Sequence, residues 1–218
     1  MTETPSSESV PWQPAAFPSD PAAARQLREW LDDTGYALYG VGHDFRGADL
    51  TNGECPGAWL IDAVLAGVEL GGVRLYRADV SGADLSGANL AGADLVRAKL
   101  DRSVLRSARL DRADLVKASL HNVDASGASL RGTRIMGASL YDVDLRGADL
   151  TDAVLFHNTF KVTVDDTTLV RGLTGTVFGP VTVVGSEGSR EVGGADLEAW
   201  LSARGAEVQV IPPQGRAR

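Results

Sequence analysis

The chain has 218 residues, a formal net charge of -8 and a single cysteine, Cys55. The acidic balance argues against a protein that binds nucleic acid or anionic membranes through bulk positive charge. One cysteine excludes an internal disulfide and a Cys/His metal set. The first twenty residues lack a secretion signal, and no run approaches the roughly 18 apolar residues of a membrane span, so we expect a cytoplasmic protein.

The N-terminal part is expected to form a tail and a lid. Residues 1–19 are rich in Thr, Ser, Glu and Pro, which predicts a disordered tail. Asp20 and Pro21 are typical of a helix cap and a first-turn proline, and Gly35 is suited to end the helix. Residues 20–42 are therefore predicted to form a short helix that covers the first coil of the repeat described next.

A five-residue period governs the middle of the chain. Every fifth residue from Phe45 to Phe160 gives 24 positions, of which 18 are Leu and none is polar, and 15 of the 24 residues two places earlier are Ala. Five residues suit neither an α-helix nor a straight strand, since both would turn the leucines to different sides. The backbone must turn a corner every five residues, so twenty residues close a four-sided coil. Residues 43–160 are thus predicted to form an all-β solenoid of about six coils.

Several repeats resemble a known family. The runs Ala83-Asp84-Leu85-Ser86-Gly87, Ala88-Asn89-Leu90-Ala91-Gly92 and Ala148-Asp149-Leu150 look like the A(D/N)LxX consensus of pentapeptide repeat proteins. The resemblance implies a right-handed quadrilateral β-helix. It also implies a range of functions, because some members of the family resemble DNA and protect DNA gyrase from inhibitors.

The pattern changes after Phe160, where Asp165 falls at an expected inward leucine position. Residues 161–218 are predicted to form a small α/β cap. Its expected elements are a strand over 181–184, a helix over 196–204 and a strand over 208–211.

The sequence offers no catalytic, cofactor or metal site. Phosphate-loop, dinucleotide-binding, nucleophile-elbow and HExxH motifs are all absent. Asp precedes the inward residue in nine repeats, so a carboxylate near a Ser or His is expected from the pattern alone, and we interpret these Asp residues as hydrogen-bond acceptors at the corners. His43 is expected to be a hydrogen-bonded histidine at an inward position, and Cys55 a small buried hydrophobe.

One outer column of the predicted coils is apolar. Pro56 directly follows an inward residue, and residues at intervals of twenty after it share its column. We call the apolar residues of this column the apolar stripe, and the cations that directly follow them in the sequence the basic ladder. The stripe comprises Tyr76, Val96, Val116, Met136 and Phe156, and the ladder Arg77, Arg97 and Lys117. Soluble proteins rarely leave such a patch bare. A protein partner, a second copy of this chain, or the chain's own N-terminal segment with Trp12, Phe17 and Trp30 could cover it.

The charge pattern separates two functional hypotheses. Residues 43–160 hold 16 acidic and 13 basic side chains, a difference of only -3, and no face is uniformly acidic, because arginines interrupt the weakly negative ones. Imitation of a duplex needs a continuous acidic array. We therefore expect a non-catalytic interaction or scaffold protein that binds another protein or a second copy of this chain through the apolar stripe, with the C-terminal cap as a candidate dimer contact. The alternative is a DNA-mimic protector of gyrase, and an enzyme is the third option.

Overall fold

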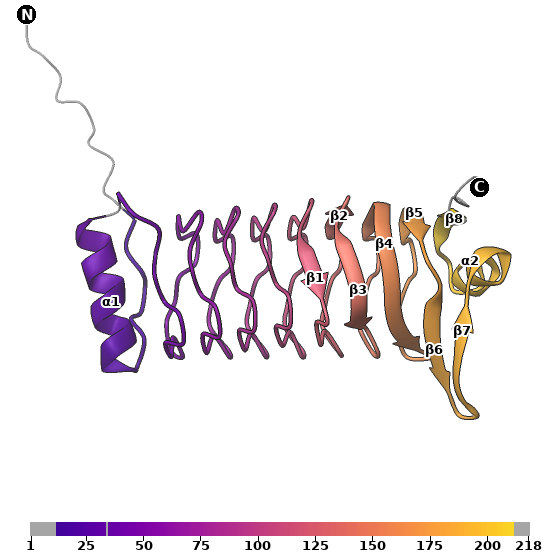
Figure 1. Cartoon of the computed structure of the whole chain (residues 1–218), viewed down its shortest axis with the longest axis horizontal. Helices are drawn as coiled ribbons and strands as arrows, with labels where there is room; N and C mark the ends of the chain where they lie inside the picture. Colours follow the sequence, from indigo (N-terminus) through magenta and orange to yellow (C-terminus); the bar gives the residue numbers. More distant parts are fainter. Residues whose placement is uncertain (1–11, 34, 212–218) are drawn as a thin grey trace, which may run out of the picture.

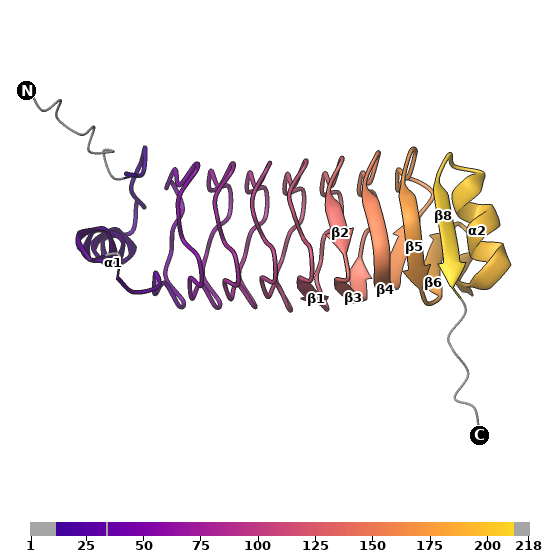
Figure 2. The same cartoon turned by 90° about the horizontal axis from the view of Figure 1, so that it is seen from above.

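The computed structural model describes residues 12–33 and 35–211. It is a rod of stacked coils with a helix across each end: α1 (Pro21–Asp32) covers the N-terminal end and α2 (Gly194–Ser202) the C-terminal end (Figures 1 and 2). None of the helices in the described ranges has the length and apolar character needed to cross a bilayer.

A twenty-residue register holds the coils together. Parallel bridges join residues twenty apart, from Tyr39↔Trp59 to Asp149↔Leu169. The column through residues 39, 59, 79, 99, 119, 139, 159 and 178 therefore places eight residues on successive rungs, so the solenoid makes seven turns rather than about six. The inward leucines and alanines are almost completely buried and form one continuous core, which confirms the predicted four-sided coil.

The N-terminal end is ordered further than expected. The Asp20 carboxylate caps α1 by accepting the Ala23 N–H at 2.8 Å, and Ala23 and Leu27 are fully buried, as a lid requires. Residues 12–19 also pack along the first coil, where the Ala15 N–H donates to the Asp49 carbonyl at 3.0 Å. The prediction of disorder was therefore wrong for residues 12–19, and residues 1–11 lie outside the described ranges.

The boundary predicted at Phe160 was also wrong, because the coils continue past it. The later coils contain regular strands, namely β1 (Ser119–His121), β2 (Arg134–Met136), β3 (Ser139–Asp144) and β4 (Val154–Asp165). Between Tyr141 and Val143 the register slips by one residue, so Val143 pairs with Val162. Val164 then takes the inward position expected for Asp165, whose carboxylate accepts the N–H groups of Thr167 and Gly147.

The C-terminal cap combines the last coil with a hairpin and a helix. Strand β5 (Thr174–Phe178) pairs with β4, and β6 (Val181–Gly185) pairs with β4 and, antiparallel, with β7 (Gly188–Val192). Strand β8 (Glu207–Ile211) runs parallel to β5 as the last rung. The predicted strand, helix and strand are all present within a few residues of their expected bounds, whereas β7 was not predicted.

Candidate protein-binding surface

The apolar stripe follows one long edge of the rod. The backbone N–H of each ladder residue donates to the carbonyl oxygen of the stripe residue one rung further on, at 2.9 to 3.0 Å. Tyr76, Val96, Val116 and Met136 are half-buried against their neighbours in the column, and Phe156 is 43% exposed. The structure therefore brings the five predicted residues together on consecutive rungs, with their outer surfaces open to solvent.

The basic ladder, unlike most other cations of the solenoid, has no ion-pair partners among the described residues. Of the 13 basic residues in 43–160, eight form ion pairs. The five with no ion-pair partner among the described residues are Arg77, Arg97, Arg102, Arg112 and Lys117. Three of these five make up the ladder, and together with Lys99 they line one shallow depression. Positive charge is thus concentrated beside the stripe.

The opposite flank of the stripe is fixed by hydrogen bonds. The carboxylates of Asp94 and Asp114 accept the N–H groups of Val96 and Val116 at 3.1 and 3.0 Å. This confirms our interpretation of the repeat aspartates as acceptors at the corners. Asp114 also pairs with Arg134 at 2.8 Å. Asp94 has no ion-pair partner among the described residues, so this flank keeps a negative charge, whereas the ladder flank is positive.

At its N-terminal end the stripe meets a hollow beneath α1. Pro56 lines it with Trp12, Trp30 and Tyr36. The Trp12 indole N–H donates to the Thr51 carbonyl at 3.0 Å, so this part of the N-terminal segment packs along the adjacent column of the first coil. Within residues 12–33 the chain does not run over Val96 to Phe156, and the described part of the segment leaves the stripe uncovered.

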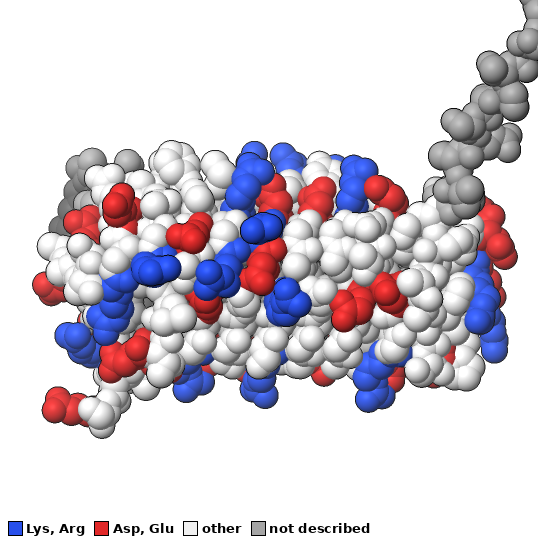
Figure 3. Space-filling model, turned by 180° about the vertical axis from the view of Figure 1, so that it is seen from behind, with Lys and Arg blue, Asp and Glu red and all other residues white. Residues whose placement is uncertain are grey.

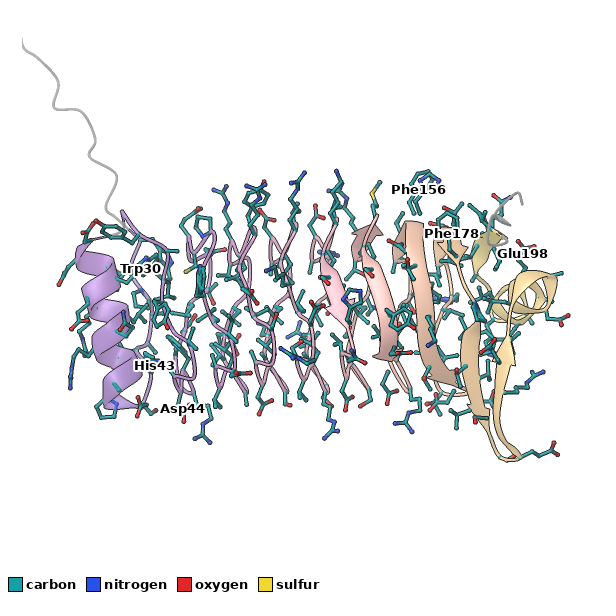
Figure 4. The ribbon with its side chains drawn as sticks, in the orientation of Figure 1. Trp30, His43, Asp44, Phe156, Phe178 and Glu198 are labelled. Atoms are coloured by element: carbon teal, nitrogen blue, oxygen red, sulfur yellow. The ribbon has the colours of Figure 1, made fainter. Side chains whose placement is uncertain are left out.

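At its C-terminal end the stripe widens into an aromatic cluster. The His157 ring lies 4.1 Å from the Phe156 ring and 6.2 Å from that of Phe178, between centroids. Phe156 lies at a long edge of the rod, and Phe178 lies inside that edge, nearer the C-terminal cap (Figure 4). Sequence reasoning missed Phe178, because it pairs with Thr159 and so lies in a neighbouring column, from which its ring reaches His157.

One cluster superficially resembles a hydrolase triad. His121 Nε2 lies 2.7 Å from Ser139 Oγ, and Nδ1 lies 3.3 Å from Asp101. However, Nδ1 faces the Ser119 hydroxyl at 3.2 Å, and that hydroxyl donates to Asp101. The Ser139 N–H donates to a carbonyl of the preceding coil, so it cannot stabilise an oxyanion. We interpret the cluster as a polar ladder that joins successive coils.

The other residues singled out in the sequence have structural surroundings. His43 Nδ1 lies 2.9 Å from the Val41 carbonyl (Figure 4), as expected for a hydrogen-bonded histidine. Burial, with a smaller contribution from the charge of Glu54, raises the pKa of the Cys55 thiol to about 12, so the thiolate needed for nucleophilic chemistry is scarce at neutral pH. Within the described ranges, no three His, Cys, Asp or Glu side chains converge as a metal site would require.

The acidic side chains of the solenoid are largely compensated. Nine of the 16 in residues 43–160 lie in ion pairs with Arg or Lys. On the face turned to the viewer in Figure 3, acidic and basic side chains are interspersed rather than gathered into an acidic array. A surface of this kind lacks the uniform negative potential of a nucleic-acid duplex.

Comparison with known proteins gives a family and a set of similar folds. The family model described as pentapeptide repeats matches residues 44–82, 83–122 and 113–152, which together span half of the chain. No curated protein matches. A pentapeptide repeat protein from the Arabidopsis thaliana thylakoid lumen is 25% identical over 60% of this chain and 79% of its own, with a TM-score of 0.39.

Two further solved structures are similar to the chain. HetL, a pentapeptide repeat protein involved in heterocyst differentiation regulation in the cyanobacterium Nostoc, is 23% identical over 84% of this chain and 91% of its own, with a TM-score of 0.30. QnrB1, a plasmid-mediated fluoroquinolone resistance protein, is 17% identical over 83% of this chain and 94% of its own, with a TM-score of 0.26. At this level of similarity, these structures do not distinguish between functions.

Proposed function

This chain belongs to the pentapeptide repeat family, and from that premise we propose that it is a non-catalytic interaction protein whose rod binds a protein partner along the apolar stripe and the basic ladder. The coils supply a rigid support, because every rung is bonded to the next. The outer columns are then free to carry recognition without disturbing the core.

The observation that carries the proposal is the coincidence of two independent features on one edge. Half-exposed apolar side chains occupy five successive rungs, and the cations without counter-ions among the described residues concentrate beside them. Bare apolar surface favours association, and unpaired cations favour partners of opposite charge. Packing of the protein's own coils requires neither feature.

The test is a capture experiment with matched surface variants. Val116→Glu with Met136→Glu places two charges on the stripe, and Ala66→Glu with Ser86→Glu places two at equivalent positions of another column. Each double variant is first shown to keep its far-UV circular dichroism and melting temperature. We expect proteins retained by the wild-type chain and the Ala66/Ser86 variant to be lost specifically from the Val116/Met136 variant, with their identities established by mass spectrometry.

Other results would point elsewhere. Sedimentation analysis that finds a dimer in the wild type and a monomer in the Val116/Met136 variant would make a second copy the partner. Retention of gyrase subunits by all three proteins would instead favour the DNA-mimic alternative. If every captured protein is retained equally by the two double variants, the stripe is not the binding surface.

A further inference from the structure

The spacing of the stripe restricts what can lie along it. Neighbouring rungs are about 4.8 Å apart, so the four intervals from Tyr76 to Phe156 span about 19 Å. An α-helix that presents one side chain every 3.5 residues offers contacts about 5.3 Å apart, or about 21 Å over four intervals. An extended strand in the same direction presents same-side residues about 6.7 Å apart. Four such intervals span about 27 Å, which exceeds the length of the stripe by more than one rung. A helix therefore matches the stripe far better.

The charges restrict the partner further. The ladder cations Arg77, Arg97 and Lys117 stand on three consecutive rungs along one side of the stripe. On the opposite side, Asp114 is already paired with Arg134. Asp94 on that side has no ion-pair partner among the described residues. A helix seated on the stripe would thus meet unpaired positive charge along one flank and no unpaired positive charge along the other. Carboxylates repeated every three to four residues on one flank would match the rungs.

The backbone of the ladder gives a third observation. Arg77, Arg97 and Lys117 have φ angles of 59°, 60° and 58°, in the left-handed region, whereas Gly57 and Gly137 occupy the same column with φ angles of 67° and 62°. Glycine takes this conformation without the Cβ penalty that other residues incur. Arg102 and Arg112 take the same conformation in other columns, so left-handed φ angles are common at the corners. Backbone geometry does not require cations in the ladder, and what the ladder offers a partner is its charge.

We infer that the partner presents an amphipathic α-helix of about four turns, with acidic residues along one flank, which lies parallel to the rod axis on the apolar stripe. This inference rests on the proposed function, since it specifies what binds the same surface. The apolar side of the helix packs on Val96, Val116 and Met136, and one end reaches the aromatic cluster of Phe156 and Phe178. The acidic flank faces the basic ladder.

The test uses three fluorescent 18-residue peptides as probes. The first has Leu at heptad positions a and d and Glu along one flank. The second replaces those Glu residues with Lys. The third has the composition of the first in an order that alternates apolar and acidic residues and cannot form an amphipathic helix. Fluorescence anisotropy measures affinity, and circular dichroism measures helix gained on binding. We expect the first peptide to bind at least about tenfold more tightly than the others and to gain helix.

Matched protein variants locate the acidic contact. Arg77→Gly with Arg97→Gly removes two ladder charges, and Arg102→Gly with Arg112→Gly removes two charges from equivalent left-handed corners of other columns, at φ angles of 61° and 59°. Since glycine suits all four corners, both variants should fold. We expect the first pair to weaken binding of the acidic helix about tenfold or more and the second pair to change it less than about twofold.

The outcomes separate this inference from the proposed function. Equal binding of the alternating and helical acidic peptides, or failure of the acidic helix to bind at all, would overturn the helical partner. If the Val116→Glu, Met136→Glu variant still fails to capture the protein that the wild type retains, the proposed function stands even though the helical partner is rejected. Equal effects of the two arginine pairs would overturn the acidic flank. Binding of the acidic helix that is insensitive to Val116 and Met136 would remove the stripe as its site.

Discussion

At Asn158 a buried side chain replaces a backbone bond of the repeat. At most corners the alanine N–H donates to the carbonyl three residues earlier, as Ala118 does to Leu115 at 3.1 Å. At the Ile135–Ala138 corner both groups bond instead to the fully buried Asn158 of the next coil. Its Oδ1 accepts the Ala138 N–H at 2.8 Å, and its Nδ2 donates to the Ile135 carbonyl at 2.5 Å. The Asn158 side chain thus supplies the hydrogen bonds of this corner in the preceding coil.

Asn158→Ala should lower the free energy of unfolding by about 2 kcal/mol or more, because it leaves a buried N–H and a buried carbonyl without partners. Urea denaturation monitored by circular dichroism measures the change. Asn52→Gly is the control, since Asn52 is exposed with a φ of 57° and glycine fits that conformation. A loss of stability no larger for Asn158→Ala than for the control would show that the corner reforms by itself.

At the scale of elements, the junction between the coils and the cap depends on Gly175. Its φ is 121°, and a Cβ at this position would overlap the Leu155 carbonyl oxygen of the adjacent strand β4. Strand β5 in turn carries the last rung, β8, which packs against α2. The Glu198 carboxylate of α2 (labelled in Figure 4) accepts the Val210 N–H of β8 at 2.6 Å. One close backbone approach therefore supports the part of the cap that is built on β5, whereas β6 joins β4 directly.

Gly175→Ala should separate β5 from β4 and destabilise the protein by about 3 kcal/mol or more, which is the range of severe steric substitutions. Gly92→Ala is the matched control: Gly92 has a φ of 69° with open space around it, so only the conformational cost of about 1 kcal/mol applies. Limited proteolysis should release the cap from the Gly175 variant first. Equal protease resistance of the two variants would contradict this role.

The elements differ in how well the sequence predicts them. The coils and the stripe could be predicted because a strict period fixes which side chains share a column. The solenoid beyond Phe160 could not, because a single-residue slip hides Val162 and Val164 from a count of five. The docking of residues 12–19 depends on tertiary contacts of a segment without periodicity. Which cations have ion-pair partners is likewise decided by side-chain geometry, so the sequence locates the basic ladder but cannot show that its cations are unpaired among the described residues.

At the scale of the whole molecule, repeated aspartates make stability dependent on acid. Hydrogen bonds from Arg46 and Thr51 lower the pKa of Asp44 and Asp49. For four others, burial raises the pKa, but hydrogen bonds from neighbouring hydroxyl, N–H and cationic groups outweigh it and leave the pKa below its ordinary value. These four are Asp79, Asp124, Asp149 and Asp165. The same interaction, repeated along the rod, couples protonation to unfolding.

The sign of the pH dependence follows from these lowered values. A carboxyl whose folded pKa lies below its unfolded value of about 3.9 stabilises the fold above that pH, and the contribution is lost as the pH falls through the folded pKa. We expect the melting temperature to change little between pH 7 and pH 5 and to fall steadily below about pH 4. Asp79→Asn should reduce the steepness of that fall. A melting temperature at pH 3 equal to that at pH 6 would contradict the assignment.

The slip between Tyr141 and Val143 is corrected within the same coil, because Asp149 again pairs with Leu169, twenty residues on. The column in which a residue lies thus depends on the number of residues that precede it in the solenoid. Gain or loss of twenty residues would lengthen or shorten the rod and keep every column in place. Gain or loss of five would preserve the core but rotate all later coils by a quarter turn, which would divide the apolar stripe between two faces. Homologues that share the apolar stripe should therefore differ in length by whole coils.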